Sequence, residues 1–364
     1  MKVFSKILIA ANIIVVIPLI ICYLAHLISP DKFPYFLLFT FAYPYILGIN
    51  LLFLIAWLFI NRKIALIFLI IILIGSPLIT RLIPIQGYFR KLSPQNDDLK
   101  ILSYNVRLFN LYNWREKDNL KDAMFSFVEA QNPDIACFQE YFWSSNDYFP
   151  TTQVLTEKLN APYNYYTTSI EPIGNQHFGI ATFSKYPIVN KGEISFENTH
   201  NLIIYTDILY LDDTIRIYNC HLQSMYFNED NYNEIDNLNL DRLKDGKVNG
   251  LFPVLKKIIK SSQIRTQQSN TLAKNIKSSP YPVIVCGDFN DNPFSYTYTT
   301  IKANLKDSYT KAARKPGYTW KKSLITQRID FVFYPKEFIC TNHKVIHIDY
   351  SDHFPLIVSL RKNN

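Results

Sequence analysis

"VIVCGDFNDNP", residues 283–293, runs from an apolar segment directly into Asp288, Asn290, Asp291 and Asn292. The apolar half has the length and composition of a buried β-strand. Two interpretations of the polar half are open, because Asn, Asp and Pro commonly end a strand in a turn, while carboxylates and amides also build metal and catalytic sites. The stretch alone does not separate these interpretations, so the rest of the chain has to decide.

Other apolar segments of the second part of the chain also carry hard or titratable side chains at one end. Asn105 follows "ILSY", Glu140 follows "DIACFQ", His221 follows "IRIYNC", Asp330 lies within "RIDFVF", and Asp352 and His353 directly precede "FPLIVSL". Each of them alone is more often a turn residue or a hydrogen-bonded strand residue. Strand ends along one edge of a sheet, however, bring groups from distant positions into one pocket. The series therefore favours a site.

Two residues of this set need a further comment. Asp330 lies between apolar neighbours, where a carboxylate is costly to bury without a partner, and the "SDH" segment is the natural place for that partner. Asn219, two residues before His221, shares its strand face and either reaches the same pocket or is a hydrogen-bonded strand residue.

Strand patterns alternate with helical ones. Residues 120–128 and 264–276 show apolar side chains at helical spacing, and two strand-like runs flank Asp212 and Asp213 as in a hairpin. Strands mixed with helices, including hairpins as well as crossovers, indicate an α/β (α+β) fold. We predict a four-layer sandwich of two packed mixed β-sheets flanked by helices.

The ordered segments "SYNV", "CFQE", "HLQ", "GDFNDNP", "RIDFVF" and "SDHFPL" resemble the signature motifs of the endonuclease/exonuclease/phosphatase superfamily. "FGIATFSKYPI", residues 178–188, and "GYTW", residues 317–320, are similar to further segments of that fold. The resemblance covers residues 98–362 in the right order and does not extend to the residues before them. It implies a metal-dependent phosphoesterase.

The resemblance also implies a role for each site residue. Glu140 would bind the metal, with Asn105 and Asp352 beside it, and Asp288 would activate the attacking water with the help of Asn290. His353, held by Asp330, would contact the phosphate, and His221 would be a second phosphate or leaving-group contact. Whether Asp288 or His353 activates the water stays open at this point. Oxygen ligands suit Mg²⁺ or Mn²⁺, whereas a zinc site would call for a Cys/His cluster.

The first quarter of the chain is almost continuously apolar. Residues 7–28, 35–60 and 64–85 are each long enough to cross a hydrocarbon core about 30 Å thick, so they predict three transmembrane helices. A signal peptide is the alternative for the first stretch, but a clear cleavage site is missing. A transporter is disfavoured because the spans contain no acidic residue.

These features predict a membrane domain over residues 1–85, a linker over 86–98 and a catalytic domain over 99–364. Lys and Arg in the first segment and in the tight second connection favour a cytoplasmic N-terminus. With three spans, the protein would be a multi-pass protein of the cell (inner) membrane with an extracytoplasmic catalytic domain. The cysteines lack paired spacing, and we expect buried thiols rather than a zinc site or a disulfide.

The substrate is the least determined property. The net charge of +8 fits anionic partners of several kinds, since juxtamembrane Lys and Arg raise the charge of any membrane protein. The segment 225–249 is acidic in its first half, which disfavours a nucleic acid strand there. A membrane tether favours a phospholipid-like or other small phosphodiester. The alternatives are an extracytoplasmic nuclease acting on DNA or RNA and an inert membrane-anchored binding module; no protein partner can be inferred.

Overall fold

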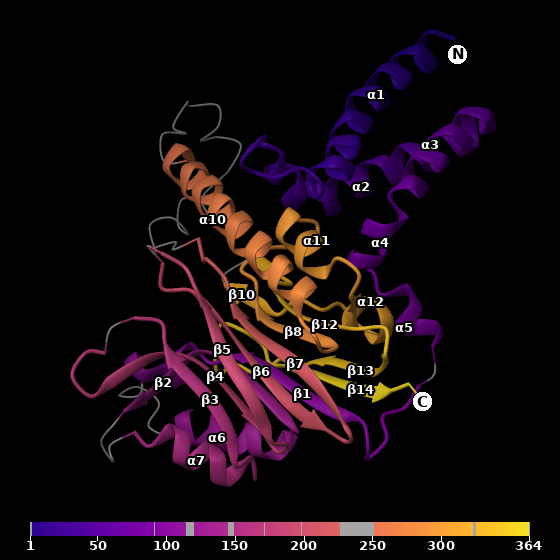
Figure 1. The fold of residues 1–364 in the computed structure, drawn as a ribbon. Helices are drawn as coiled ribbons and strands as arrows, with labels where there is room; N and C mark the ends of the chain where they lie inside the picture. Colours follow the sequence, from indigo (N-terminus) through magenta and orange to yellow (C-terminus); the bar gives the residue numbers. More distant parts are fainter. Residues whose placement is uncertain are drawn as a thin grey trace.

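The computed structural model describes the chain apart from residues 1, 91, 114–119, 145–148, 171, 198, 226–250, 323–324 and 364. Long helices at the N-terminus project from one end of a β-rich body, and the C-terminus lies on that body (Figure 1). The segment 225–249, whose acidic first half disfavours a nucleic acid strand, falls almost entirely outside the described residues.

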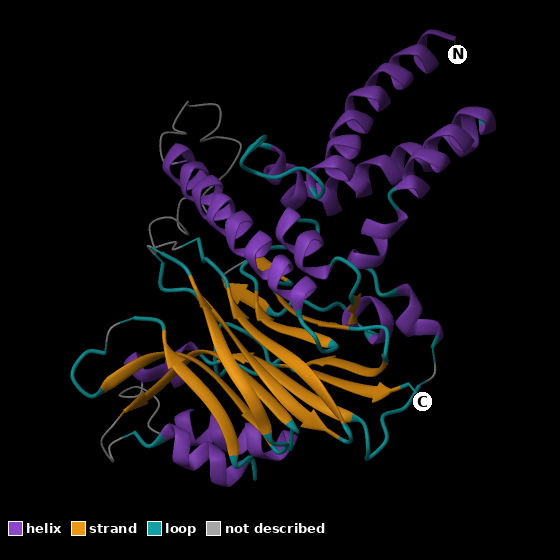
Figure 2. Cartoon of the chain, in the orientation of Figure 1, coloured by secondary structure: helices purple, strands orange, loops and turns teal. Residues whose placement is uncertain are grey.

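The described residues of the β-rich body form two six-stranded sheets, besides a small two-stranded one (Figure 2). The first has the order β13-β14-β1-β2-β4-β3 and consists of β1 (Leu99–Asn105), β2 (Ile135–Ser144), β3 (Tyr163–Thr168), β4 (Gln176–Ser184), β13 (Phe338–Val345) and β14 (Leu356–Lys362). The second has the order β5-β6-β7-β8-β12-β9 and consists of β5 (Ile188–Ser195), β6 (Leu202–Tyr210), β7 (Asp213–His221), β8 (Val283–Asp288), β9 (Lys306–Asp307) and β12 (Asp330–Tyr334). Both are mixed, because β1 and β2 pair in parallel, as do β7 and β8, while the other pairs are antiparallel.

Alternation along the strands explains why the sheets pack face to face. In β1, Ile101 belongs to the cluster between the sheets, while Leu102 faces a second cluster on the outer side. In β8, Ile284 points inward in the same way and Val285 points outward. Successive side chains of a strand lie on opposite faces, so strands that are apolar throughout need a cover on both sides.

Helices supply the outer covers. α6 (Leu120–Gln131) and α7 (Thr151–Lys158) pack on the first sheet. α10 (Leu251–Ser278) and α11 (Tyr296–Lys302) lie over the second sheet. The remaining short elements are η1 (Arg107–Asn113), α5 (Ile85–Phe89), α12 (Ser308–Ala312) and the hairpin strands β10 (Trp320–Lys322) and β11 (Ile325–Gln327). The four-layer sandwich and both helices predicted from periodicity are thereby confirmed, as is the β6–β7 hairpin.

The N-terminal region contains two helices that are each long and apolar enough to cross a membrane, α1 (Lys2–Ala25) and α2 (Phe36–Ile60). Each helix contains a proline, Pro18 in α1 and Pro44 in α2, and continues through it. The third predicted span is not one straight helix. It is divided into α3 (Arg62–Ile74) and α4 (Ser76–Leu82), which are bent by 66° relative to each other and could form one broken span.

The break in the third stretch has a local cause. Gly75 caps α3, and Pro77 follows at the start of α4. Proline has no N–H to continue the ladder of α3, so a new helix begins in a new direction. Composition alone does not distinguish this broken helix from a straight span. All five cysteines are buried and free, as predicted.

Candidate active site

The strand ends of the two sheets meet at one edge of the sandwich. In the second sheet, Asp288 at the end of β8 is paired in register with His221 of β7 on one side and with Asp330 of β12 on the other. In the first sheet, Asn105 ends β1 beside Gln139 of the parallel strand β2. The fold therefore brings together residues from five separate sequence segments.

Asn105 joins the two sheets at this edge. Its Nδ2 donates hydrogen bonds to Glu140 Oε1 and to Asp288 Oδ2, both at 3.1 Å. Its amide oxygen accepts a hydrogen bond from the backbone N–H of Arg107 at 3.1 Å. Two carboxylates that would repel each other are thus held around one amide group. The sequence predicted Asn105 beside the metal. In this structure its Nδ2 bridges the two carboxylates, and its oxygen is directed to the backbone N–H of Arg107.

Two site residues depend on left-handed backbone. Glu140 has φ 49° and lies where β2 shifts register against β4, and Asn290 has φ 52°. A bulge of this kind changes the direction of a side chain, which in a regular strand would point to one of the two faces of the sheet. Asn290 is fixed by hydrogen bonds from its backbone N–H to Asp288 Oδ1 at 2.8 Å and from Nδ2 to Leu222 O at 2.9 Å.

Gly287, directly before Asp288, allows the strands to approach at this point. It has φ +130°, and a Cβ there would lie 2.1 Å from Cys220 O of β7. Only glycine adopts this conformation without strain, and no side chain fits the space. Gly287 is therefore required by the close pairing of β7 and β8.

His353 is the partner that the sequence predicted for Asp330 within the "SDH" segment. Its Nδ1 lies 3.0 Å from Asp330 Oδ2, and its Nε2 lies 3.6 Å from Asp288 Oδ2. Burial disfavours the imidazolium, but the carboxylates of Asp330 and Asp288 outweigh this and raise the pKa of His353 to about 10. His353 is consequently a buried cation at neutral pH.

The other titratable groups respond mainly to burial. The loss of water raises the pKa of Asp288 to about 6, against the opposing effect of the imidazolium of His353. Burial also raises the pKa of Glu140, although its side chain keeps 37% of its surface open. The pKa of His221 is lowered by burial, and its Nε2 lies 3.8 Å from Glu140 and 3.9 Å from Asp288.

The donor set fits a hard divalent cation. Glu140, Asp288 and Asp352 offer carboxylate oxygens, the ligand type that Mg²⁺ and Mn²⁺ prefer. Asp352 lies beside the site, with Oδ1 3.9 Å from Arg107 Nε. Asp288, Asp330 and His353 also form a compact group with ligand-type atoms within 4.8 Å of one another. We interpret that group as an acid–imidazole pair next to a carboxylate, because Asp330 is already bonded to His353 Nδ1.

Several supporting residues were not singled out from the sequence. Thr319 Oγ1 accepts hydrogen bonds from the backbone N–H groups of Ile329 and Asp330, at 3.1 and 3.0 Å, and so fixes the start of β12. Ser351 Oγ donates to Asn105 O at 2.9 Å and accepts from the backbone N–H of His353 at 3.2 Å. Both lie inside segments that carried the resemblance, "GYTW" and "SDHFPL", which was the available signal.

Asn219 is a hydrogen-bonded residue of the core rather than part of the pocket surface. It is fully buried, accepts a hydrogen bond from Gln139 Nε2 at 2.6 Å and donates to Ala181 O at 2.9 Å. These contacts join β7 to β2 and β4, and so connect the two sheets close to Glu140 and His221, since Gln139 directly precedes Glu140 and Asn219 is two residues before His221. Of the two interpretations left open for Asn219, the structure supports the second.

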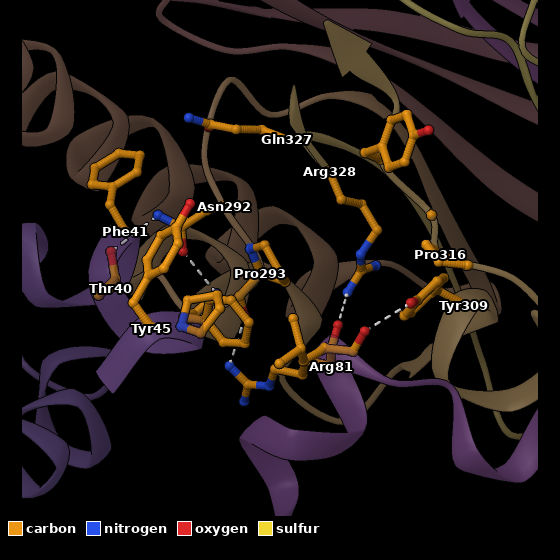
Figure 3. Close-up of a pocket in the computed structure, with 15 residues that line it drawn as sticks. Thr40, Phe41, Tyr45, Arg81, Asn292, Pro293, Tyr309, Pro316, Gln327 and Arg328 are labelled. Atoms are coloured by element: carbon orange, nitrogen blue, oxygen red, sulfur yellow. Dashed lines mark hydrogen bonds between the residues drawn. The ribbon is translucent and has the colours of Figure 1, made fainter. Parts of the chain in front are cut away.

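The rest of the "GDFNDNP" loop is bound to helices. Asp291 pairs with Arg265 of α10 at 3.2 Å, and Asn292 Nδ2 donates to Thr40 Oγ1 of α2 at 3.0 Å (Figure 3). Phe294 packs against Tyr43 of α2 with ring centroids 4.6 Å apart. The turn residues therefore connect the site to the N-terminal helices.

Comparisons with known proteins agree with this fold. A family model described as the Endonuclease/Exonuclease/phosphatase family matches residues 102–353, and a second, described as a domain of unknown function, matches residues 5–82. No curated protein matches the chain. The boundaries predicted for membrane domain, linker and catalytic domain are not tested by these matches.

Solved structures share the fold at low sequence identity. An endonuclease/exonuclease/phosphatase family protein from Leptotrichia buccalis is 20% identical with a TM-score of 0.51, over 72% of this chain and 99% of that chain. A family protein from Bacteroides vulgatus is 18% identical with a TM-score of 0.52, over 73% and 99%. D. rerio TDP2, complexed with single strand DNA product, is 16% identical with a TM-score of 0.51, over 73% and 99%. With the family model matching well over half of its residues, the chain belongs to the endonuclease/exonuclease/phosphatase family.

Proposed function

We propose that this chain is a membrane-tethered, divalent-metal-dependent phosphodiesterase. The observation that carries the proposal is the surroundings of Asp288. One buried carboxylate contacts the amides of Asn105 and Asn290 and lies within 3.9 Å of the imidazoles of His221 and His353. Hydrolysis of a phosphodiester needs these functions: a base for water, cationic donors for the phosphate oxygens and groups that fix both.

Glu140, Asp352 and Asn105 are the residues that we propose to hold Mg²⁺ or Mn²⁺. The bound cation would offset the charge on the phosphate and polarise one of its oxygens. For Asn105 to contribute its oxygen, the amide would have to turn away from its present hydrogen bonds to Glu140 and Asp288. Asn105 would otherwise position the two carboxylates.

Asp288 is the proposed base. Its pKa, raised to about 6 by burial, leaves it ionised at neutral pH and makes it a stronger base than an exposed aspartate. Asn290, bonded to it through its backbone N–H and its Nδ2, keeps one face of the carboxylate directed into the site. A water held at that face would lose its proton to Asp288 as it attacks the phosphorus.

His353 is the proposed phosphate contact. Asp330 binds its Nδ1, so the charged Nε2–H is directed toward the position of the phosphate. We assign the cation to this role rather than to water activation, because an imidazole that is already protonated cannot act as a base. His221, whose pKa is lowered, is neutral at physiological pH, and the N–H of its ring would donate a hydrogen bond to the leaving oxygen.

For the substrate, we favour a phospholipid-like or other small phosphodiester. α1 and α2 are apolar enough to span a bilayer, and many large apolar side chains on them are exposed, such as Leu52 at 66% and Phe59 at 87%. Tethered in this way, the site would lie close to lipid headgroups. We further propose an inner-membrane location with the catalytic domain on the extracytoplasmic side.

A nuclease is the second candidate, since the D. rerio TDP2 structure of the same fold is complexed with single strand DNA product. A substrate panel separates the two. The full chain in detergent would be incubated with phosphatidylcholine, sphingomyelin, plasmid DNA and single-stranded RNA, each with Mg²⁺, Mn²⁺ or EDTA. We expect metal-dependent release of a lipid headgroup. Cleavage of nucleic acid alone would show that the protein is a nuclease. If none of the phosphodiesters is hydrolysed, the protein would be the inert binding module.

A further inference from the structure

A cavity of about 540 Å³ lies between the membrane helices and the catalytic sandwich (Figure 3). Thr40, Phe41 and Tyr45 of α2 line it, and so do Tyr318 and Arg328 from the second half of the chain. Ligand pockets commonly enclose about 300 to 1,000 Å³ and combine apolar walls with a few polar groups, so this cavity has the size and composition of a binding site. It is separate from the cluster around Asp288.

Arg81, in the last turn of α4, lines this cavity, and its guanidinium lies over the ring of Tyr298, 4.6 Å from the centroid. Its hydrogen bonds to the described residues, to Pro293 O at 3.0 Å and to Thr299 Oγ1 at 3.1 Å, both start from Nη1. Within the described part of the chain, no carboxylate lies at ion-pair distance from Arg81. Nε and Nη2 therefore have donor capacity left for a ligand.

The second arginine of the cavity is different. Arg328 pairs with Asp307 at 3.0 Å, and its guanidinium stacks over Tyr309 at 4.1 Å. It also donates to Arg81 O at 3.1 Å, as Figure 3 shows. Its charge is balanced within the protein. The comparison leaves Arg81 as the group that would attract an anion.

The position of the cavity indicates where that anion comes from. Thr40 and Tyr45 lie in the first part of α2, at the end of the membrane helices that contacts the catalytic sandwich. Beyond them α2 continues with exposed apolar side chains, among them Ile49 at 45% and Leu52 at 66%. In a bilayer, the cavity would thus lie at the level of the lipid headgroups, with the apolar surface of α2 leading away toward the acyl chains.

We propose that this cavity binds the headgroup phosphate of an anionic phospholipid. Arg81 would donate to the phosphate oxygens through Nε and Nη2, a geometry that guanidinium groups provide and lysine does not. The rings of Phe41, Tyr45 and Tyr318 would cover the glycerol part of the lipid. The same chemistry would recognise free phosphate, but only a lipid also uses the apolar surface of α2. This binding site does not depend on the proposed catalytic activity.

The test is a binding titration of the purified full chain in a neutral detergent, with EDTA present so that no lipid is hydrolysed. The probes are dioctanoyl phosphatidylglycerol, dioctanoyl phosphatidylcholine and inorganic phosphate, and the readouts are the dissociation constant and the shift of the thermal unfolding midpoint. We expect phosphatidylglycerol to bind about 10-fold or more tightly than either other probe, because the choline cation of phosphatidylcholine offsets the charge of its phosphate and inorganic phosphate lacks the acyl chains.

Arg81→Gln should remove that preference, while Arg62→Gln, at the exposed start of α3, should bind phosphatidylglycerol as the unaltered chain does. Should Arg81→Gln fail to fold, Tyr45→Ala provides the second variant, because this side chain is 76% exposed and its loss leaves the interior intact. It should weaken binding of phosphatidylglycerol several-fold. Equal binding of the two lipids, full binding by both cavity variants, or inorganic phosphate binding as tightly as phosphatidylglycerol would each overturn the proposal.

Discussion

The substitution Asp330→Asn isolates the contribution of one carboxylate to the proposed mechanism. It keeps the size of a side chain that is 2% exposed and preserves the hydrogen bond that the backbone N–H of Asp330 donates to Thr319 Oγ1, but it replaces the charged acceptor of His353 Nδ1. A hydrogen bond to a charged partner contributes about 1.5 to 3 kcal/mol. If the imidazolium acts on the transition state, kcat should fall by about 10- to 150-fold. Because charge on the phosphate oxygens is greatest in the transition state, the loss should appear in kcat more than in KM.

The pH dependence gives the same prediction a sharper form. With Asp330 and Asp288 beside it, His353 has a pKa of about 10 and stays charged across the neutral range. Without the Asp330 carboxylate the pKa of His353 falls, so His353 loses its proton at a lower pH than in the unaltered chain. The defect of Asp330→Asn should accordingly be larger at pH 9 than at pH 6. Both kinetic constants would be measured with saturating Mg²⁺ on a chromogenic phosphodiester.

The matched control is Asp207→Asn. Asp207 is also fully buried and carries an ion pair with Arg216 at 2.6 Å, but it lies in β6 away from the site. It should lower the unfolding midpoint without changing the pH profile of kcat. An Asp330→Asn enzyme with kcat within about 2-fold of the unaltered chain at every pH, or a control with the same pH-dependent loss, would refute the role given to the Asp330–His353 pair.

Three other predictions concern the support of the site and of the fold. Thr40→Val removes the hydroxyl of α2 that accepts a hydrogen bond from Asn292, and a neutral hydrogen bond contributes about 1 kcal/mol. If this bond positions the loop that carries Asp288, kcat should fall about 5-fold in Thr40→Val and stay unchanged in Thr40→Ser. Unchanged turnover in Thr40→Val would exclude such a positioning role for α2. Gly287→Ala should lower the free energy of unfolding, measured by denaturant titration, by more than about 2 kcal/mol. Gly174→Ala, at a position with open surroundings and also at positive φ, should lower it by about 1 kcal/mol. Equal losses in the two variants would contradict the packing argument. Burial lowers the pKa of His343 to about 3, so between pH 6.5 and 3 the unfolded chain binds a proton at this residue that the folded chain does not. As the pH falls through that window, His343 should lower the unfolding free energy by about 1.4 kcal/mol per pH unit, and the slope of His343→Gln should differ from that of the unaltered chain by this amount; identical slopes would contradict the explanation.

Much of the site could be predicted because its geometry follows from strand ends. A polar residue directly after an apolar strand lies at the edge of the sheet, and Asn105, His221 and Asp288 all occupy that position. The partner of Asp330 could be inferred from the cost of burying a lone carboxylate, and His353 fills that role. These inferences use only local sequence and general energetics.

What could not be predicted depends on contacts between distant residues. The hydrogen bond from Asn292 to Thr40 spans 252 positions, and no pattern in either segment indicates it. Arg81 of α4 likewise reaches Pro293 and Thr299 of the catalytic domain, although its helix looked like part of a membrane span. The bend at Gly75 was missed for the related reason that hydropathy records composition and not direction.

The central claim is that the cluster around Asp288 hydrolyses phosphodiesters with the help of a divalent metal. The most direct measurement is release of p-nitrophenol from bis(p-nitrophenyl) phosphate by the full chain in detergent, compared with Asp288→Ala and His353→Ala. We predict turnover that requires Mg²⁺ or Mn²⁺, is abolished by EDTA and falls by about 10²- to 10⁴-fold in each variant while the unfolding transition stays cooperative. Near-normal hydrolysis by both variants, or hydrolysis that is unaffected by EDTA, would contradict the account.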